Sequence, residues 1–161
     1  MGRKKVLVYF LILILMGLFF VFVFNTLRSK RVRFYLEDEY YNDNGLTDVS
    51  VKELEEMLEY KESFILFVYN DFCSFSVPCD SIFEDRSKKM NMQIFQIPYR
   101  DFKKSSLKRK VKYSPTVIIF NKGKVVKYLD PEKDEDKERY QNKFSFENWV
   151  TENVYQKKEK K

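Results

Sequence analysis

The stretch Phe64-Ile-Leu-Phe-Val-Tyr-Asn-Asp-Phe-Cys-Ser-Phe-Ser-Val-Pro-Cys79 contains both cysteines of the chain, Cys73 and Cys79. Its first half is an apolar, β-branched and aromatic run without helical period, which predicts a buried central strand that ends in a turn. The residues that follow, 80–90, have a composition compatible with a helix. The cysteines therefore lie where a strand is followed by a helix, and the unpaired N–H groups and positive dipole at a helix start favour a thiolate.

The composition of the 161-residue chain restricts the chemistry that it can perform. Histidine is absent, which excludes a Cys–His or Ser–His–Asp nucleophile and a histidine metal site. Two cysteines are too few for a closed zinc site, so we expect no metal and no cofactor. Aromatic residues make up 17% of the chain, with only four glycines and four prolines, which indicates a packed globular core. The length allows one domain and an appendage.

The formal net charge of +6 raises the question of nucleic-acid binding. Basic and acidic residues are interspersed along the chain, and the clearest group of lysines is at the extreme C-terminus. No motif typical of nucleic-acid-binding proteins is present. We therefore expect no nucleic-acid partner.

The N-terminal region has the composition of a membrane anchor. A short basic head, 1–5, is followed by uninterrupted apolar sequence from Val6 to Phe24. This run is long enough to cross a hydrocarbon core of about 30 Å as a helix. No small-residue cleavage site follows Phe24, which argues against a removed signal peptide. The sequence predicts a single transmembrane helix.

The orientation of this helix is not decided by charge, because the basic residues on its two sides nearly balance. These residues are Arg3, Lys4 and Lys5 before the span and Arg28, Lys30, Arg31 and Arg33 after it. A very short head is typical of an uncleaved signal-anchor. We therefore expect a single-pass protein of the cell membrane with a cytoplasmic N-terminus and its domain outside the cytoplasm.

Between the anchor and the cysteine stretch, the polar, turn-rich residues up to 48 are expected to be a juxtamembrane linker with room for a short edge strand. Ser50-Val-Lys-Glu53 is a capping box and predicts the start of a short helix. After the cysteines and their helix, residues 93–99 are predicted to be another strand. Asp101 is expected to cap a short basic helix through Lys110.

Two apolar, β-rich runs, 117–120 and 125–128, flank a turn that contains glycine and predict a hairpin. The almost purely charged segment 130–143 is expected to be a solvated loop, and Ser145 to cap a final helix. This order predicts a central mixed sheet with helices on both faces. The expected parts are a basic head, an anchor, a linker, one domain and a basic tail, at 1–5, 6–25, 26–48, 49–156 and 157–161.

This order of elements, with these residues, resembles the thioredoxin superfamily over roughly residues 49–154. Phe72 stands at the aromatic position directly before the family's nucleophilic cysteine, which is Cys73 here. Ser114-Pro115-Thr116 matches the family's cis-proline segment, and only X-Pro bonds adopt the cis form at low energy. The resemblance implies an α/β thioredoxin-like fold. It also implies that Ser114 presents its backbone to the substrate.

The chain departs from the family pattern at two places. The family's active cysteines are separated by two residues, but Ser76 occupies the second place here and Cys79 follows later. A second register aligns Ser76-Val-Pro-Cys79 with the family's Cys-Gly-Pro-Cys, and it would shorten the following helix by about one turn. Phe67 stands where the family usually has a buried carboxylate, which removes the usual proton acceptor for the resolving thiol.

The sequence does not decide whether Cys73 and Cys79 form a disulfide. In a continuous helix, six residues span about 9 Å and point apart, which is too far for this bond. Pro78 is favoured in the first turn of a helix, so a helix that starts near Pro78 would leave the preceding residues free to fold back.

Three functions are compatible with these residues. In the first, Cys73 attacks a protein disulfide and Cys79 resolves the mixed disulfide, while Phe72, Ser76, Ser114 and Pro115 contact the substrate. The analogy is with membrane-anchored thioredoxin-like proteins of bacterial cell surfaces, including accessory factors for disulfide-containing peptides. In the second, the domain is a scaffold that binds a partner protein at the membrane, with a structural disulfide. In the third, Cys73 acts alone as a monothiol.

Overall fold

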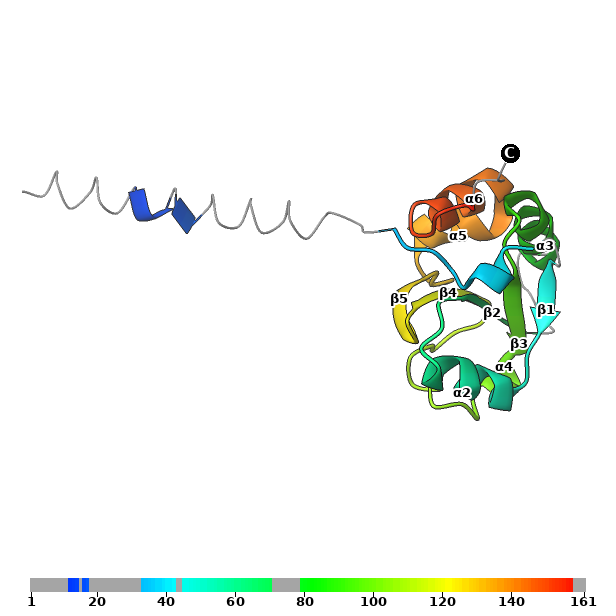
Figure 1. The fold of residues 1–161 in the computed structure, drawn as a ribbon. Helices are drawn as coiled ribbons and strands as arrows, with labels where there is room; N and C mark the ends of the chain where they lie inside the picture. The colour runs from blue at the N-terminus through cyan, green and yellow to red at the C-terminus, as the bar shows by residue number, and fades with distance from the viewer. Residues whose placement is uncertain (1–11, 15, 18–32, 43–44, 71–78, 158–161) are drawn as a thin grey trace, which may run out of the picture. The chain divides into compact units, whose positions relative to one another are not determined.

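The computed structural model describes residues 12–14, 16–17, 33–42, 45–70 and 79–157. The chain divides into two compact units, Met1–Val32 and Arg33–Lys161. The second unit holds the strands and named helices of the described residues, shown in Figure 1. In chain order these are η1 (Asp38–Tyr40), β1 (Leu46–Asp48), α2 (Val51–Glu59), β2 (Ile65–Tyr69), α3 (Cys79–Met90), β3 (Ile94–Pro98), α4 (Tyr99–Phe102), β4 (Thr116–Asn121), β5 (Lys124–Tyr128), α5 (Asp134–Gln141) and α6 (Lys143–Thr151).

The strands form a single mixed sheet in the order β1-β3-β2-β4-β5, which confirms the predicted central mixed sheet. β1, β3 and β2 are mutually parallel, whereas β4 runs antiparallel to β2 and β5 antiparallel to β4. The connection through α2 moves across the sheet from β1 to β2, and the connection through α3 moves back from β2 to β3. Two right-handed crossovers of opposite direction place α2 and α3 on opposite faces.

The core is aromatic, as the composition predicts. β2 is buried along nearly its whole length, as expected for a central strand with both faces covered. Phe67 projects from it onto Phe83 of α3, with ring centroids 4.9 Å apart, and Phe83 packs against Phe146 of α6 at 4.4 Å. These contacts join the sheet to α3 and α6. Phe67, at the position of the family's carboxylate, is thus a core residue with 1% of its surface exposed.

The predicted capping box is present at the start of α2. The Ser50 hydroxyl accepts a hydrogen bond from the Glu53 N–H at 3.2 Å, and the Glu53 carboxylate accepts one from the Ser50 N–H at 2.7 Å. The predicted hairpin is also confirmed as β4 and β5, joined at Lys122 and Gly123. Both elements are specified by local chemistry, which explains why the sequence is sufficient to predict them.

The segment 130–143 is not a solvated loop. It contains α5, and two of its residues, Asp136 and Tyr140, are buried. These residues are four positions apart and therefore lie on one face of α5. Their burial holds α5 against the rest of the domain, although the other residues of this helix are polar. The prediction failed because a single aromatic residue among charges gives almost no periodic signal.

Two predicted helix caps are wrong. Asn142, and not Ser145, caps α6, because its side-chain oxygen accepts from the N–H groups of Phe144 and Ser145 at 2.9 and 3.2 Å. Asp101 lies inside α4, which begins after Pro98 and has only four residues. The carboxylate of Asp101 accepts from the Lys104 ammonium at 2.7 Å instead.

The chain enters the second unit beside the start of β2. The backbone N–H of Glu37 donates to the Ser63 carbonyl at 3.1 Å, and the Glu37 carboxylate accepts from the Ser63 N–H at 3.1 Å. Phe34 pairs with Val154 after α6. Residues 33–42 and 45–48, within the segment expected to be a linker, thus belong to this compact unit. We call this region the entry end of the sheet.

The predicted transmembrane segment, Val6 to Phe24, lies mostly outside the described residues. Residues 12–14 and 16–17 within it are helical. Among the residues that the structure describes, no helix is both long and apolar enough to span a membrane.

Candidate functional site

The candidate site is built where β2 ends and β4 begins. Because these strands are antiparallel, Val68 near the end of β2 pairs with Thr116 at the start of β4. The peptide bond between Ser114 and Pro115, just before β4, is cis, which confirms that prediction. The Ser114 hydroxyl donates to the Val68 carbonyl at 3.3 Å. The cis-proline segment therefore lies directly beside the end of the strand that leads to Cys73.

A groove opens at this position, with a volume of about 400 Å³. We call it the cis-proline groove. It is bounded by residues from the end of β2, from α4 and the segment before β4, and from the segment that leads into α5. Its lining residues are Asn70, Tyr99, Lys112, Tyr113, Ser114, Pro115, Pro131, Glu132 and Lys137. The structure thus brings the predicted residues Ser114 and Pro115 together in a concave surface.

The buried side chain of Tyr140 forms a hydrogen bond to the cis-proline segment. Its ring is fully buried, and its hydroxyl lies within donor distance of the Pro115 carbonyl at 3.0 Å and the Leu129 carbonyl at 2.9 Å. Burial raises the pKa of Tyr140 well above its usual range, and the charge of Asp136 and the thiol of Cys79 act in the same direction. Tyr140 is therefore a neutral hydrogen-bond donor at all physiological pH values.

Cys79 is the first residue of α3, and only 3% of its surface is exposed. It does not line the cis-proline groove. Its thiol contributes to the raised pKa of Tyr140, although less than burial of the Tyr140 ring does. Cys73, Phe72 and Ser76, the other predicted site residues, lie outside the described residues.

Asp136 is the buried acid on this side of the sheet. Its carboxylate accepts from the backbone N–H of Asp130 at 3.0 Å and from the Arg139 guanidinium. These bonds fix the segment between β5 and α5, which forms one wall of the groove. A sequence signal for Asp136 and Tyr140 exists only in their spacing of four residues, which is weak in a segment so rich in charge.

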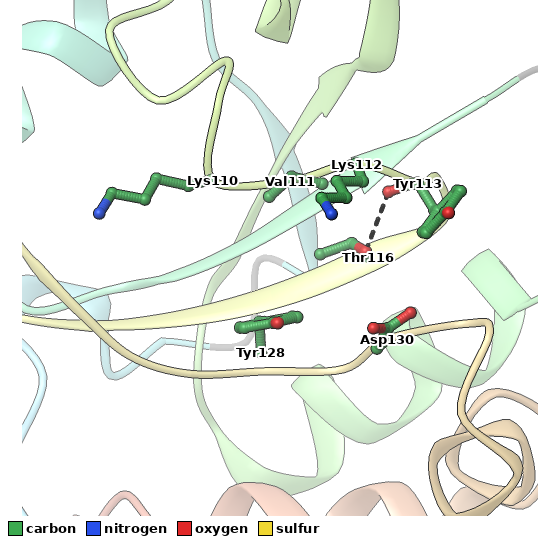
Figure 2. Close-up of a pocket in the computed structure, with 7 residues that line it drawn as sticks. All are labelled: Lys110, Val111, Lys112, Tyr113, Thr116, Tyr128 and Asp130. Carbon is green, nitrogen blue, oxygen red and sulfur yellow. Dashed lines mark hydrogen bonds between the residues drawn. The ribbon is translucent and has the colours of Figure 1, made fainter.

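A second, smaller hollow of about 190 Å³ adjoins the groove and shares Lys112 and Tyr113 with it. Figure 2 shows it between the segment before β4 and the end of β5, with Lys110, Val111 and Lys112 along one side and Tyr128 and Asp130 along the other. The dashed line marks the hydrogen bond from the Thr116 hydroxyl to the Tyr113 carbonyl, 3.1 Å. We call this the lysine hollow.

The described part of the chain contains no group of three or more acidic or cysteine side chains placed to hold a metal ion. Beside Pro115, the cis-proline groove is lined by both charged and aromatic side chains, including Lys112, Lys137 and Tyr113.

Comparison with known proteins identifies the fold. No family model and no curated protein matches the sequence. Among solved structures, the J-Trx1 fragment of ERdj5 matches with a TM-score of 0.51 at 15% identity, over 68% of this chain and 51% of that one. Oxidised thioredoxin of Plasmodium falciparum matches with a TM-score of 0.47 at 17% identity, over 62% of this chain and 98% of that one.

Oxidised thioredoxin O1 of Arabidopsis thaliana matches with a TM-score of 0.48 at 15% identity, over 67% of this chain and 96% of that one. The chain spans about half the length of the ERdj5 fragment. At these identities the likeness concerns the fold alone. Together with the sheet order and the cis peptide before β4, it shows that the chain has a thioredoxin-like fold.

Proposed function

We propose that this protein is a membrane-anchored thiol–disulfide oxidoreductase, or a disulfide-handling accessory factor, that acts on protein thiols and disulfides outside the cytoplasm. The observation that supports this most directly is the cis Ser114–Pro115 peptide in a groove at the end of β2. Such a groove offers backbone groups to an extended polypeptide. It is also the part of the fold that the chain reaches just before its first cysteine.

The spacing between the groove and Cys73 is short. Asn70 lines the groove, and Cys73 follows it by three residues. Three trans peptide units span at most about 11 Å between Cα atoms. The chain length thus allows Cys73 to act on a substrate held against Pro115. We expect Phe72 and Ser76, the neighbours of Cys73, to contact the same substrate.

The proposed reaction transfers two electrons from the protein dithiol to a substrate disulfide. The Cys73 thiolate attacks one sulfur of the substrate disulfide, a new S–S bond forms, and the other substrate sulfur leaves as a thiolate that takes up a proton. The Cys79 thiolate then attacks the Cys73 sulfur, forms the Cys73–Cys79 disulfide and releases the second substrate thiol. The reverse sequence oxidises a substrate dithiol.

The predicted membrane anchor determines on which side of the membrane the domain would act. We propose that Val6 to Phe24 spans the membrane with the N-terminus in the cytoplasm, so that the domain lies outside it. The entry end, where Glu37 bonds to Ser63, and the groove, where Asn70 lies, are at opposite ends of β2. The anchored end of the domain is thus not the end that would receive a substrate.

The two cysteines can be tested separately. Cys79→Ser should trap a mixed disulfide between Cys73 and a substrate, because the resolving thiol is missing, and Cys73→Ser should abolish exchange. The measurement is the mass of covalent adducts from cells treated with an alkylating agent, with and without reduction. If both variants keep full cellular activity and neither gives an adduct, the redox function is wrong.

A binding scaffold is the second candidate, and two observations favour it. Phe67 replaces the usual buried carboxylate, and Cys79 is buried at the start of α3. In this case the cysteines form a structural disulfide, and the groove holds a partner protein at the membrane without exchange. A monothiol reaction of Cys73 alone would be recognised by an adduct that forms regardless of Cys79.

A further inference from the structure

The segment 103–112 is the most strongly basic part of the described domain. It has six cationic residues and no acidic residue in ten positions, and every cationic side chain is exposed. These residues are Lys103, Lys104, Lys108, Arg109, Lys110 and Lys112. We call it the basic segment. It leads directly from α4 into the cis-proline segment.

Among the described residues, most of this charge has no carboxylate within ion-pair distance. Lys104 pairs with Asp101 at 2.7 Å, and the ammonium of Lys103 lies 4.5 Å from the centre of the Tyr99 ring. In the part of the chain that the structure describes, no ion pair joins a carboxylate to the other four cations of the basic segment. A surface of this kind attracts an anionic ligand and accelerates its association.

The basic segment is continuous with the candidate site. Lys110 and Lys112 line the lysine hollow, and Lys112 also lines the cis-proline groove. In Figure 2 the Lys112 side chain points toward Thr116, the Lys110 side chain extends away from the other labelled residues, and Tyr128 and Asp130 lie on the opposite side. Tyr113 and Tyr128 are half exposed and offer apolar area beside the charges. A chain that crosses the hollow would therefore continue into the groove.

The position of the basic segment favours a protein ligand over a lipid surface. The chain enters the domain at the start of β2, whereas Lys110 and Lys112 line the hollow beside Thr116, which pairs with Val68 near the end of β2. A strand of five residues is about 17 Å long. Lys110 and Lys112 thus lie near the end of β2 opposite to the one at which the chain enters the domain.

We infer that the basic segment binds an acidic stretch of a polypeptide, which then passes over the lysine hollow into the cis-proline groove. This inference deepens the proposed function, because it assigns a class of substrate to the same groove. The occupant is an extended protein segment with Asp or Glu residues on the side that meets Lys110 and Lys112. Binding itself needs no cysteine in either partner.

The test uses the full chain in non-ionic detergent micelles and short fluorescent peptides of equal length that lack cysteine. One peptide is rich in Asp and Glu, one has Asn and Gln at the same positions, and one has Lys. Fluorescence anisotropy gives the affinity at low and high salt. We expect the acidic peptide alone to bind, and its affinity to fall as salt is added.

The double variant Lys110→Gln/Lys112→Gln should weaken binding of the acidic peptide about fivefold or more, since it removes two exposed ion pairs with the peptide. The matched control is Lys52→Gln/Lys88→Gln, which removes the same charge from exposed lysines of α2 and α3. It should leave binding unchanged. Equal loss in the two double variants, or equal binding of the three peptides, would overturn the inference.

A lipid surface is a distinct outcome of the same assay. Phosphatidylglycerol added to the micelles should not displace the acidic peptide. Displacement that is lost in Lys110→Gln/Lys112→Gln would make the basic segment a lipid site and overturn the inference. This test and the test of the redox function can fail independently. If Cys79→Ser traps a mixed disulfide but the acidic peptide does not bind, only the inference is rejected. If the acidic peptide binds but no mixed disulfide is trapped, only the redox function is rejected.

Discussion

The two ends of β2 differ in how their polar groups are used. At the entry end, the backbone and side chain of Glu37 bond to Ser63, and the Tyr41 hydroxyl donates to the Tyr155 carbonyl at 2.7 Å. At the groove end, Lys112 and Lys137 line an open groove, the Tyr99 hydroxyl in its wall donates to the Lys112 carbonyl at 2.8 Å, and the Tyr140 hydroxyl bonds to the Pro115 carbonyl. One end is closed by the chain's own hydrogen bonds, and the other leaves its surface to a ligand. If the proposed function is right, stability and binding are separated along one strand.

Substitutions at the two ends test whether they differ in this way, and we give them in order of the expected loss of stability. The largest effect is expected for Phe64→Ala at the entry end. Phe64 is fully buried and stacks on Phe120, with ring centroids 4.4 Å apart. Loss of a buried phenylalanine lowers the free energy of unfolding by about 3–5 kcal/mol. Urea denaturation followed by circular dichroism measures it. The groove-end control, Tyr113→Ala, should stay within about 0.5 kcal/mol, because its side chain is exposed.

The next effect is expected for Tyr140→Phe beneath the groove. The substitution keeps the buried ring and removes the donor to the Pro115 and Leu129 carbonyls. A buried acceptor without its donor lowers the free energy of unfolding by about 1–3 kcal/mol. Because Pro115 lines the groove, the affinity for the acidic peptide should fall as well. Unchanged peptide affinity together with a stability loss would show that Tyr140 serves the core alone.

A smaller effect is expected for Tyr41→Phe at the entry end. The Tyr41 hydroxyl accepts from the Leu36 N–H at 3.0 Å and donates to the Tyr155 carbonyl. We expect a loss of about 1 kcal/mol in the free energy of unfolding, the usual net value of a hydrogen bond. Peptide affinity should not change, because this hydroxyl is remote from the groove. Weaker peptide binding in Tyr41→Phe would contradict the separation of the two ends.

The smallest effect is a pH dependence. The pKa of Tyr140 is raised in the folded protein, so above the ordinary tyrosine pKa of about 10 the unfolded state loses a proton that the folded state keeps. Stability therefore falls as the pH rises through about 10, and Tyr140→Phe lacks this loss. The stability gap between wild type and Tyr140→Phe should narrow by about 0.4 kcal/mol at pH 10 and more steeply above it. A constant gap would show that Tyr140 ionises normally.

Features that are specified by local sequence were predicted correctly. The strand Ile65–Tyr69, the capping box at Ser50 and the hairpin after Pro115 follow from local patterns, and all are present. The cis bond before β4 followed from the resemblance to the thioredoxin superfamily. These features depend on neighbours in the chain or on a motif, so a single sequence is enough to identify them.

Features that depend on tertiary contacts were missed. α5 is helical because Asp136 and Tyr140 find buried partners in the segments before and after β4 and β5, which no local pattern reveals. Residues 33–42 join the domain through backbone bonds to Ser63 and to the region of Val154, and residues 46–48 join it by pairing with β3. The groove walls, including Lys112 and Lys137, come from segments distant in sequence. Spacing alone does not bring such residues together.

The most direct test of the proposed exchange reaction is a redox titration of the full chain in glutathione buffers, with alkylated thiols counted by mass. The account predicts a reversible two-electron couple between Cys73 and Cys79 at a potential above roughly −270 mV, the range of catalytic dithiols. A bridge that stays oxidised below about −300 mV would identify a structural disulfide and a scaffold. If no bridge forms between the two cysteines, the two-cysteine mechanism is contradicted.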